Sequence, residues 1–125
     1  MIEIKTTKKK ITILVIERGV ELIRQLKRIC SEKKFVIRAA QTIEHGFEHF
    51  EENEIDIMIL TGSVARFGRI RGMEYLDIIS EKSAATQILF LSSSKDMSLV
   101  FSALKRGSYQ YGKLPIPDVE LEMLI

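Results

Sequence analysis

Apolar segments alternate along the chain with segments in which apolar side chains recur every three or four positions. The apolar segments cover residues 11–16, 35–40, 55–60 and 88–91, and a weaker, more polar one covers residues 108–112. Most are rich in Ile, Val, Leu and Phe without regular polar alternation, which is typical of strands that are covered on both faces. We therefore predict five strands of a parallel sheet.

Helical stripes of apolar residues separate these strands. The stripes are Leu22, Leu26 and Ile29; Ile43, Phe47 and Phe50; Leu76 and Ile79; and Met97, Val100, Phe101 and Leu104. Residues with this spacing share one face of an α-helix. Residues 118–125 begin a fifth helix that stops after about two turns. This abrupt end predicts that the last helix is truncated and that a C-terminal output domain is missing from the chain.

The order of the elements and the length of the chain predict one α/β domain. Strands that alternate with helices form a parallel sheet with helices on both faces, in three layers. A length of 125 residues leaves room for a single domain. We divide the chain into an N-terminal flank, residues 1–10, and the domain itself, residues 11–125.

Composition and charge narrow the class of protein. Apolar residues make up 46% and charged residues 29% of the chain, as in globular domains. Residues 1–10 hold four Lys and one Glu, whereas the other residues hold 15 basic and 16 acidic side chains, so the basic character belongs to the flank. The single Cys30 excludes an internal disulfide, and no apolar run approaches the length of a membrane span. We expect a cytoplasmic protein.

Several local signatures resemble the receiver domain of two-component response regulators, which has a flavodoxin-like, doubly wound (βα)5 fold. They are residues 13–17, 55–60, 72–76, 88–92 and 103–107, and Tyr111 followed by Lys113, Leu114 and Pro115. The resemblance covers residues 10–125. It implies a non-enzymatic domain of phosphorelay signal transduction, including transcription regulation, that controls an output domain or a protein partner.

The resemblance also implies a phosphoacceptor pocket, and this chain departs from it. In the family, acidic residues after the first strand bind Mg²⁺, and an Asp that ends the third strand accepts the phosphoryl group. Here Glu17 is followed by Arg18 in place of the second acid, and Thr61 stands at the phosphoacceptor position. We expect aspartyl-phosphate chemistry to be lost.

The other pocket positions are kept only in part. Ser92 retains the hydroxyl of the family, but Lys113 stands one residue earlier than the family's Lys, because Leu114 directly precedes Pro115. With one carboxylate beside several cations, we expect weak or absent Mg²⁺ binding and no cofactor. The sequence thus predicts a pseudo-receiver that regulates through phosphorylation-independent protein–protein contact.

Simpler structural roles compete with residual chemistry at these positions. For Glu17 we favour an ion pair with Lys113 or Arg18 over metal binding. For Thr61 and Ser92 we favour hydrogen bonds to nearby backbone over phosphorylation. A receiver that responds to an anionic ligand or to Ser/Thr modification remains the alternative.

Tyr111 and the surface around it carry the expected partner contacts. Tyr111 stands where the family has an aromatic residue that rotates when the pocket is occupied; otherwise it packs half-buried under the last helix. The family uses the face built from its fourth helix, fifth strand and fifth helix, which here bears Lys95, Lys105, Arg106, Tyr109 and Tyr111. We expect a protein partner or a homodimer at this face, no membrane contact, and nucleic-acid binding only through the missing output domain.

Two further features suggest other classes of function. A loop after the third strand carries Arg66, Arg69 and Arg71 without an acid, which favours an anionic ligand or an acidic partner, although a solvated loop is the simpler interpretation. His45, Glu48 and His49 fit the letters H-x-x-E-H of one metalloprotease class, but no third ligand is indicated, so we expect no zinc enzyme.

A flavodoxin-like nucleotide-binding or enzymatic domain is the alternative from another class. Against it, the turn after the first strand, Glu17-Arg18-Gly19, lacks the glycine fingerprint that cradles a phosphate.

Overall fold

The computed structural model of the chain describes residues 10–30, 35–61, 77–79, 81–83, 85–93 and 110–125. The strands are β1 (Ile11–Ile16), β2 (Phe35–Ala40), β3 (Ile57–Thr61), β4 (Gln87–Ser92) and β5 (Gln110–Lys113). The helices are α1 (Glu21–Ile29), α2 (Ile43–Glu52) and α6 (Asp118–Leu124), and residues 77–79 and 81–82 are also helical. The predictions for Arg66, Arg69, Arg71, Lys95, Lys105, Arg106 and Tyr109 lie outside the described residues.

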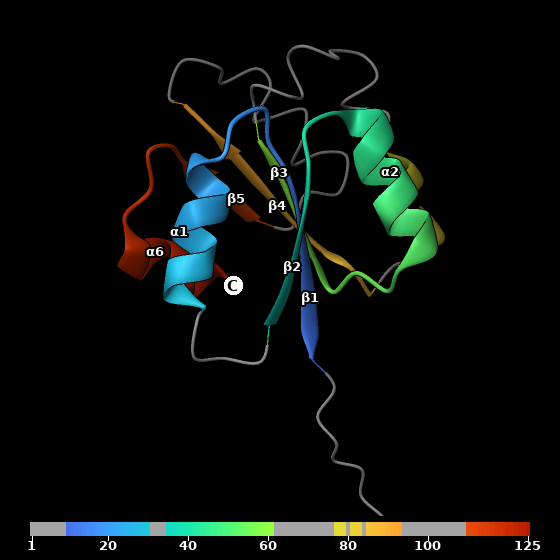
Figure 1. Cartoon of the computed structure of the whole chain (residues 1–125), viewed down its shortest axis with the longest axis horizontal. Coiled ribbons are helices and arrows are strands. Elements are labelled where there is room, and N and C mark those ends of the chain that lie inside the picture. Colours follow the sequence, from blue (N-terminus) through green and yellow to red (C-terminus); the bar gives the residue numbers. More distant parts are fainter. Residues whose placement is uncertain (1–9, 31–34, 62–76, 80, 84, 94–109) are drawn as a thin grey trace, which may run out of the picture.

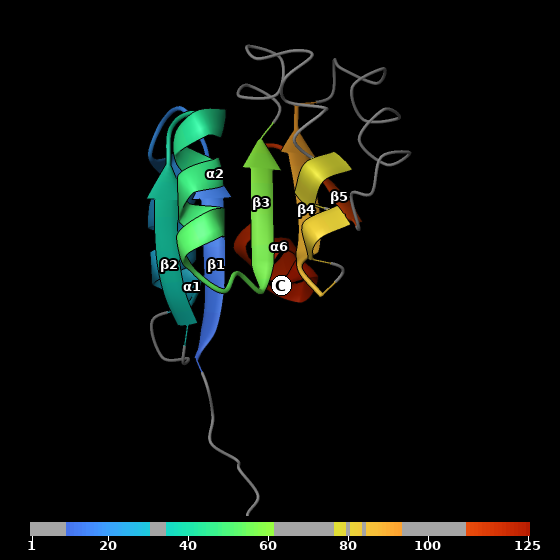
Figure 2. The ribbon, with the colours of Figure 1, turned by 90° about the vertical axis from the view of Figure 1, so that its right-hand side faces the viewer.

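All strand pairs are parallel, and the sheet has the order β2-β1-β3-β4-β5. This is the strand order of a flavodoxin-like doubly wound fold, so the predicted fold class is confirmed. The strands point the same way in Figure 2, and their carboxyl ends therefore lie at one edge of the sheet. We call it the carboxyl edge, and the opposite one the amino edge.

Alternate side chains of the strands enter two separate apolar clusters. Leu14 and Ile16 of β1 pack on the same side as α2, whereas Ile13 and Val15 pack on the side of α1 and α6. Figure 1 shows α2 and the pair α1 and α6 on opposite sides of the sheet. The three predicted layers are thus present. The single Cys30 is buried in the second cluster.

The bounds of β3 and β4 differ from the predicted ones by one or two residues. β3 begins at Ile57 rather than at residue 55 and ends at Thr61 rather than at residue 60. Ile55 is buried, but its carbonyl accepts the hydroxyl of Thr86 at 2.8 Å, a side-chain bond that stands outside the strand ladder. β4 extends the predicted residues 88–91 by one at each end.

Polar side chains fasten α6 to α1. Gln25 Nε2 donates to the carbonyl of Ile116 at 2.7 Å and to Asp118 Oδ1 at 2.9 Å, and Arg28 forms an ion pair with Asp118 at 2.8 Å. The hydrogen bond from Arg28, followed by that from Gln25, holds the pKa of the Asp118 carboxyl below its ordinary value. Leu121 on the same short helix is fully buried. The last helix is therefore held by both apolar and polar contacts.

Candidate functional site

The strand register brings the predicted pocket residues to the carboxyl edge. Ile16, which precedes Glu17, lies opposite Leu60, which precedes Thr61. On the next strands, Ser92 of β4 lies opposite Lys113 of β5. The central strands β1, β3 and β4 thus end side by side, as expected for residues that act at one site.

Glu17 binds the beginning of α1. Its carboxylate accepts the backbone N–H groups of Leu22 at 2.9 Å and Ile23 at 3.3 Å, and the residue is only 9% exposed. These N–H groups belong to the first turn of the helix, which lacks intrahelical acceptors and carries partial positive charge. The sequence favoured an ion pair with Lys113 or Arg18, and the structure shows two N–H groups of the helix start as partners of the carboxylate. A helix end supplies the positive partner.

The hydroxyl of Thr61 is buried and bonded to the main chain. Its hydroxyl donates to the carbonyl of Ile16 at 3.0 Å across the β1–β3 pair, and the residue is 2% exposed. The prediction that this hydroxyl bonds to backbone is confirmed, although its partner lies on the neighbouring strand and not in the following turn.

Ser92 and Lys113 end their strands in different surroundings. Ser92 is 1% exposed, and its hydroxyl donates to the carbonyl of Ser93 at 3.2 Å, as predicted for backbone capping. Lys113 is exposed. The peptide bond that follows, Leu114–Pro115, is cis. The edge therefore has one exposed cation on its β5 side and a buried hydroxyl beside it.

Arg18 and Tyr111 complete the predicted set. Arg18 is exposed, and its carbonyl accepts Gln41 Nε2 at 3.2 Å. Tyr111 is half-buried, as one alternative predicted, but it packs against the cluster on the α2 side of the sheet. Its neighbour Gly112 faces Leu124 and Ile116 on the α6 side. The expected place of Tyr111 under the last helix is wrong, because neighbouring strand residues face opposite sides.

The family assignment follows from the sequence as a whole. The profile of the response regulator receiver domain matches residues 13–124. The chain belongs to this family. Among curated proteins, no relative matches significantly.

Solved structures share the receiver fold at low sequence identity. A signal receiver domain of an HD domain-containing protein from Pseudomonas fluorescens Pf-5 is 19% identical with a TM-score of 0.85, covering 98% of this chain and 89% of that one. A response regulator from Thermotoga maritima is 19% identical with a TM-score of 0.79, covering 93% and 95%. NtrX from Brucella abortus is 20% identical with a TM-score of 0.78, covering 93% of this chain but 26% of that one. These likenesses concern the fold alone.

The described part of this receiver domain does not fit a Mg²⁺ ion at the carboxyl edge. Mg²⁺ needs several oxygen ligands, usually including one or two carboxylates. Glu17 is the carboxylate that the strand ends bring there, and both of its oxygens already accept backbone N–H groups. Among the described residues, no group of three or more His, Cys, Asp and Glu side chains could hold a metal ion.

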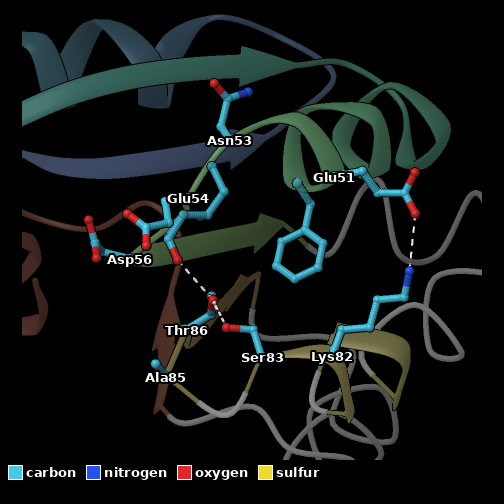
Figure 3. A pocket seen from close by; sticks show the side chains of 10 residues that line it. Glu51, Asn53, Glu54, Asp56, Lys82, Ser83, Ala85 and Thr86 are labelled. Atoms are coloured by element: carbon cyan, nitrogen blue, oxygen red, sulfur yellow. Dashed lines mark hydrogen bonds and ion pairs between the residues drawn. The ribbon is translucent and has the colours of Figure 1, made fainter.

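A separate hollow of about 530 Å³ lies near the amino edge (Figure 3). It is lined by the end of α2, the segment between α2 and β3, and the segment before β4: Phe50, Glu51, Asn53, Glu54, Ile55, Asp56, Lys82, Ser83, Ala85 and Thr86. Several polar groups in it bond to one another: Lys82 to Glu51 at 3.1 Å and Ser83 to Thr86 at 2.9 Å. Sequence reasoning missed this hollow, because its lining comes from two stretches that lie far apart in the chain and carry no motif.

No helix in the described part of the chain has the length and apolar character needed to cross a bilayer.

Proposed function

We propose that this receiver domain regulates without aspartyl phosphorylation, through contact with a protein partner or an output domain. The main support for this proposal is the environment of Thr61 at the end of β3. Thr61 occupies the position at which the resemblance implies a phosphoacceptor Asp, and its hydroxyl is buried in a bond to the carbonyl of Ile16. A carboxylate is a ready acceptor of a phosphoryl group, whereas a hydroxyl requires a base to activate it. A backbone carbonyl is not such a base.

The same closure argues against the alternative in which Thr61 or Ser92 is modified. Both residues are almost fully buried, and both hydroxyls donate to backbone carbonyls. A modifying enzyme would have to break these bonds and open the strand ends. We therefore propose a domain that neither undergoes nor catalyses phosphoryl transfer and that uses no Mg²⁺ cofactor.

A partner surface is the remaining route by which such a domain would act. In NtrX the matched region covers 26% of that chain, so in that protein this fold is joined to a larger remainder. By analogy we propose that the present domain works in the cytoplasm on an output domain or a separate protein, including one that regulates transcription. The face around β5 is our candidate for this contact and for a homodimer.

The test is an amide-shift NMR titration, first with Mg²⁺ and then with beryllofluoride, a mimic of the aspartyl phosphate. We expect no saturable shifts at Glu17, Thr61, Ser92 or Lys113. Saturable shifts at these residues that extend to Tyr111 would contradict the proposal, because they would mean that a ligand-driven switch operates.

A double variant tests whether Arg18 and Thr61 are the reason why the domain does not bind Mg²⁺. Arg18→Asp combined with Thr61→Asp restores two carboxylates beside Glu17, and we expect it to gain saturable Mg²⁺ shifts. Arg18→Asn combined with Thr61→Asn is the matched control, since it removes the same side chains without adding charge. If the Asp variant is folded by circular dichroism and still silent, these residues are not what prevents metal binding.

A further inference from the structure

His45 and His49 stand one turn apart on α2, and the core does not use them. Ile43, Phe47 and Phe50 of this helix pack against the apolar cluster. His45 is exposed and His49 is partly exposed. Residues four positions apart lie one above the other on a helix face, so the two imidazoles form a pair at the surface.

The ring nitrogens of this pair are available for binding. The backbone N–H of His45 donates to the Thr42 hydroxyl at 3.0 Å, and the carbonyl of His49 accepts the Asn53 side chain at 3.0 Å. These are main-chain groups at the start and end of the helix. Within the described part of the chain, no hydrogen bond or ion pair occupies either imidazole. Both rings thus keep a nitrogen to offer to a ligand.

The spacing of the rings matches that of two imidazoles on one metal ion. An imidazole nitrogen binds Zn²⁺ at about 2.0–2.1 Å, which places two ring centres about 4.5–5.2 Å apart when the ligands subtend about 90–109° at the metal. In α2 the ring centroids of His45 and His49 are 4.9 Å apart, with the ring planes inclined by 42°. The pair therefore needs only small side-chain rotations to chelate an ion.

We propose that His45 and His49 form a two-imidazole surface site for a divalent transition-metal ion of the Zn²⁺, Ni²⁺ and Cu²⁺ class. Imidazole suits these ions, whereas Mg²⁺ prefers oxygen ligands. Two protein ligands leave the other coordination positions to water. The site is not a protease centre, because it lacks a third protein ligand among the described residues. An ion bound there links two turns of α2 and stabilises the folded domain by mass action.

The first test is calorimetric titration of the whole chain with Zn²⁺. We expect one equivalent to bind, and His45→Gln or His49→Gln alone to weaken the affinity at least about tenfold, because the second imidazole then no longer binds at a high effective concentration. Glu48→Gln is the matched control on the same helix, and we expect it to bind as the unchanged chain does.

A second test measures the thermal stability of the domain with and without Zn²⁺. The thermal midpoint should rise with added Zn²⁺ in the unchanged chain and in Glu48→Gln, but not in the two His variants. Circular dichroism without metal checks that each variant keeps its helix content. The absence of saturable Zn²⁺ binding overturns the proposal. So does binding that survives both His substitutions, or that is lost equally in Glu48→Gln.

Discussion

The two edges of the sheet hold their polar side chains in different ways. At the carboxyl edge, Glu17 and Thr61 are buried and bonded to main-chain groups of α1 and β1. At the amino edge, Glu51 and Lys82 pair in solvent beside an open hollow (Figure 3). Among the described residues, Glu17 and Thr61 are thus buried at the edge where the family places its chemistry, whereas the ion pair at the opposite edge is exposed.

The two edges also differ in how many carboxylates they hold, and the edge with more of them is not the one where the family has its phosphoacceptor pocket. The amino-edge hollow is lined by three carboxylates, those of Glu51, Glu54 and Asp56, and the carboxyl edge has only Glu17 among the strand-end positions that the resemblance assigns to the pocket. Phosphoryl transfer depends on positioning and on the stabilisation of charge, so carboxylates contribute only where they converge with the other groups on one reacting atom. Among the described residues, the larger number of acids lies at the amino edge, away from the strand-end positions that the resemblance assigns to the phosphoacceptor pocket.

Removing Glu17 should break the closure of the carboxyl edge most strongly. We expect Glu17→Ala to lower the free energy of unfolding by about 2 kcal/mol, because two N–H groups at a helix start lose a charged, buried acceptor. Urea denaturation measures this. Glu17→Gln keeps an acceptor and should lose about half as much. A loss no larger in Ala than in Gln would argue against the capping role.

Asp56 offers the corresponding test at the amino edge. Its carboxylate accepts the backbone N–H of Thr12 at 2.9 Å in a part-buried position. We expect Asp56→Ala to cost about 1.5 kcal/mol by the same urea measurement, less than Glu17→Ala, because one N–H is affected instead of two. Asp56→Asn is the control that keeps an acceptor. If Asp56→Ala costs more than Glu17→Ala, the order of the two edges is reversed.

Thr61→Val isolates the hydroxyl at the end of β3. The substitution keeps the shape of the side chain and removes the donor to Ile16, so we expect a loss of about 1 kcal/mol in the free energy of unfolding. Thr61→Ser, which keeps the hydroxyl but loses a methyl group, is the comparison. A Val variant as stable as the unchanged chain would show that this hydrogen bond contributes little.

The exposed pair of Arg28 and Asp118 provides a reference for charge in solvent, and its effect should be the smallest. Because the pKa of Asp118 is lowered in the folded state, its contribution is complete above the ordinary carboxyl range and is lost as the pH falls through the folded pKa. Thermal midpoints at neutral and acidic pH measure this. Asp118→Asn should reduce the acid sensitivity slightly, and an unchanged pH profile would contradict the assignment.

Sequence patterns predicted the fold well because burial and strand pairing depend on apolar runs. β1 and β2 begin and end at the predicted residues, since both are bounded by polar or turn segments. β3 was displaced by up to two residues. There the buried Ile55 is apolar, yet Thr86 binds its carbonyl from a distant part of the chain. Such a contact has no local signature.

The sequence predicted which residues lie at the candidate site, but it did not predict which groups they contact. The positions of Glu17, Thr61, Ser92 and Lys113 at strand ends follow from the order of the elements. The partner of Glu17 does not, because the first N–H groups of a helix attract a carboxylate through geometry that no residue letter encodes. The face occupied by Tyr111 depended on the register of a short strand, and a shift by one residue turns a side chain over.

The bond from Thr61 to Ile16 joins residues 45 positions apart in the chain. In a parallel sheet such neighbours are joined by a long connection, so bringing them together costs more chain entropy than a local contact does. The capping of α1 by Glu17 spans five residues and can form early. The carboxyl edge therefore combines one local contact, at the start of α1, with one long-range contact between its central strands, and the burial of the Thr61 hydroxyl depends on the long-range one.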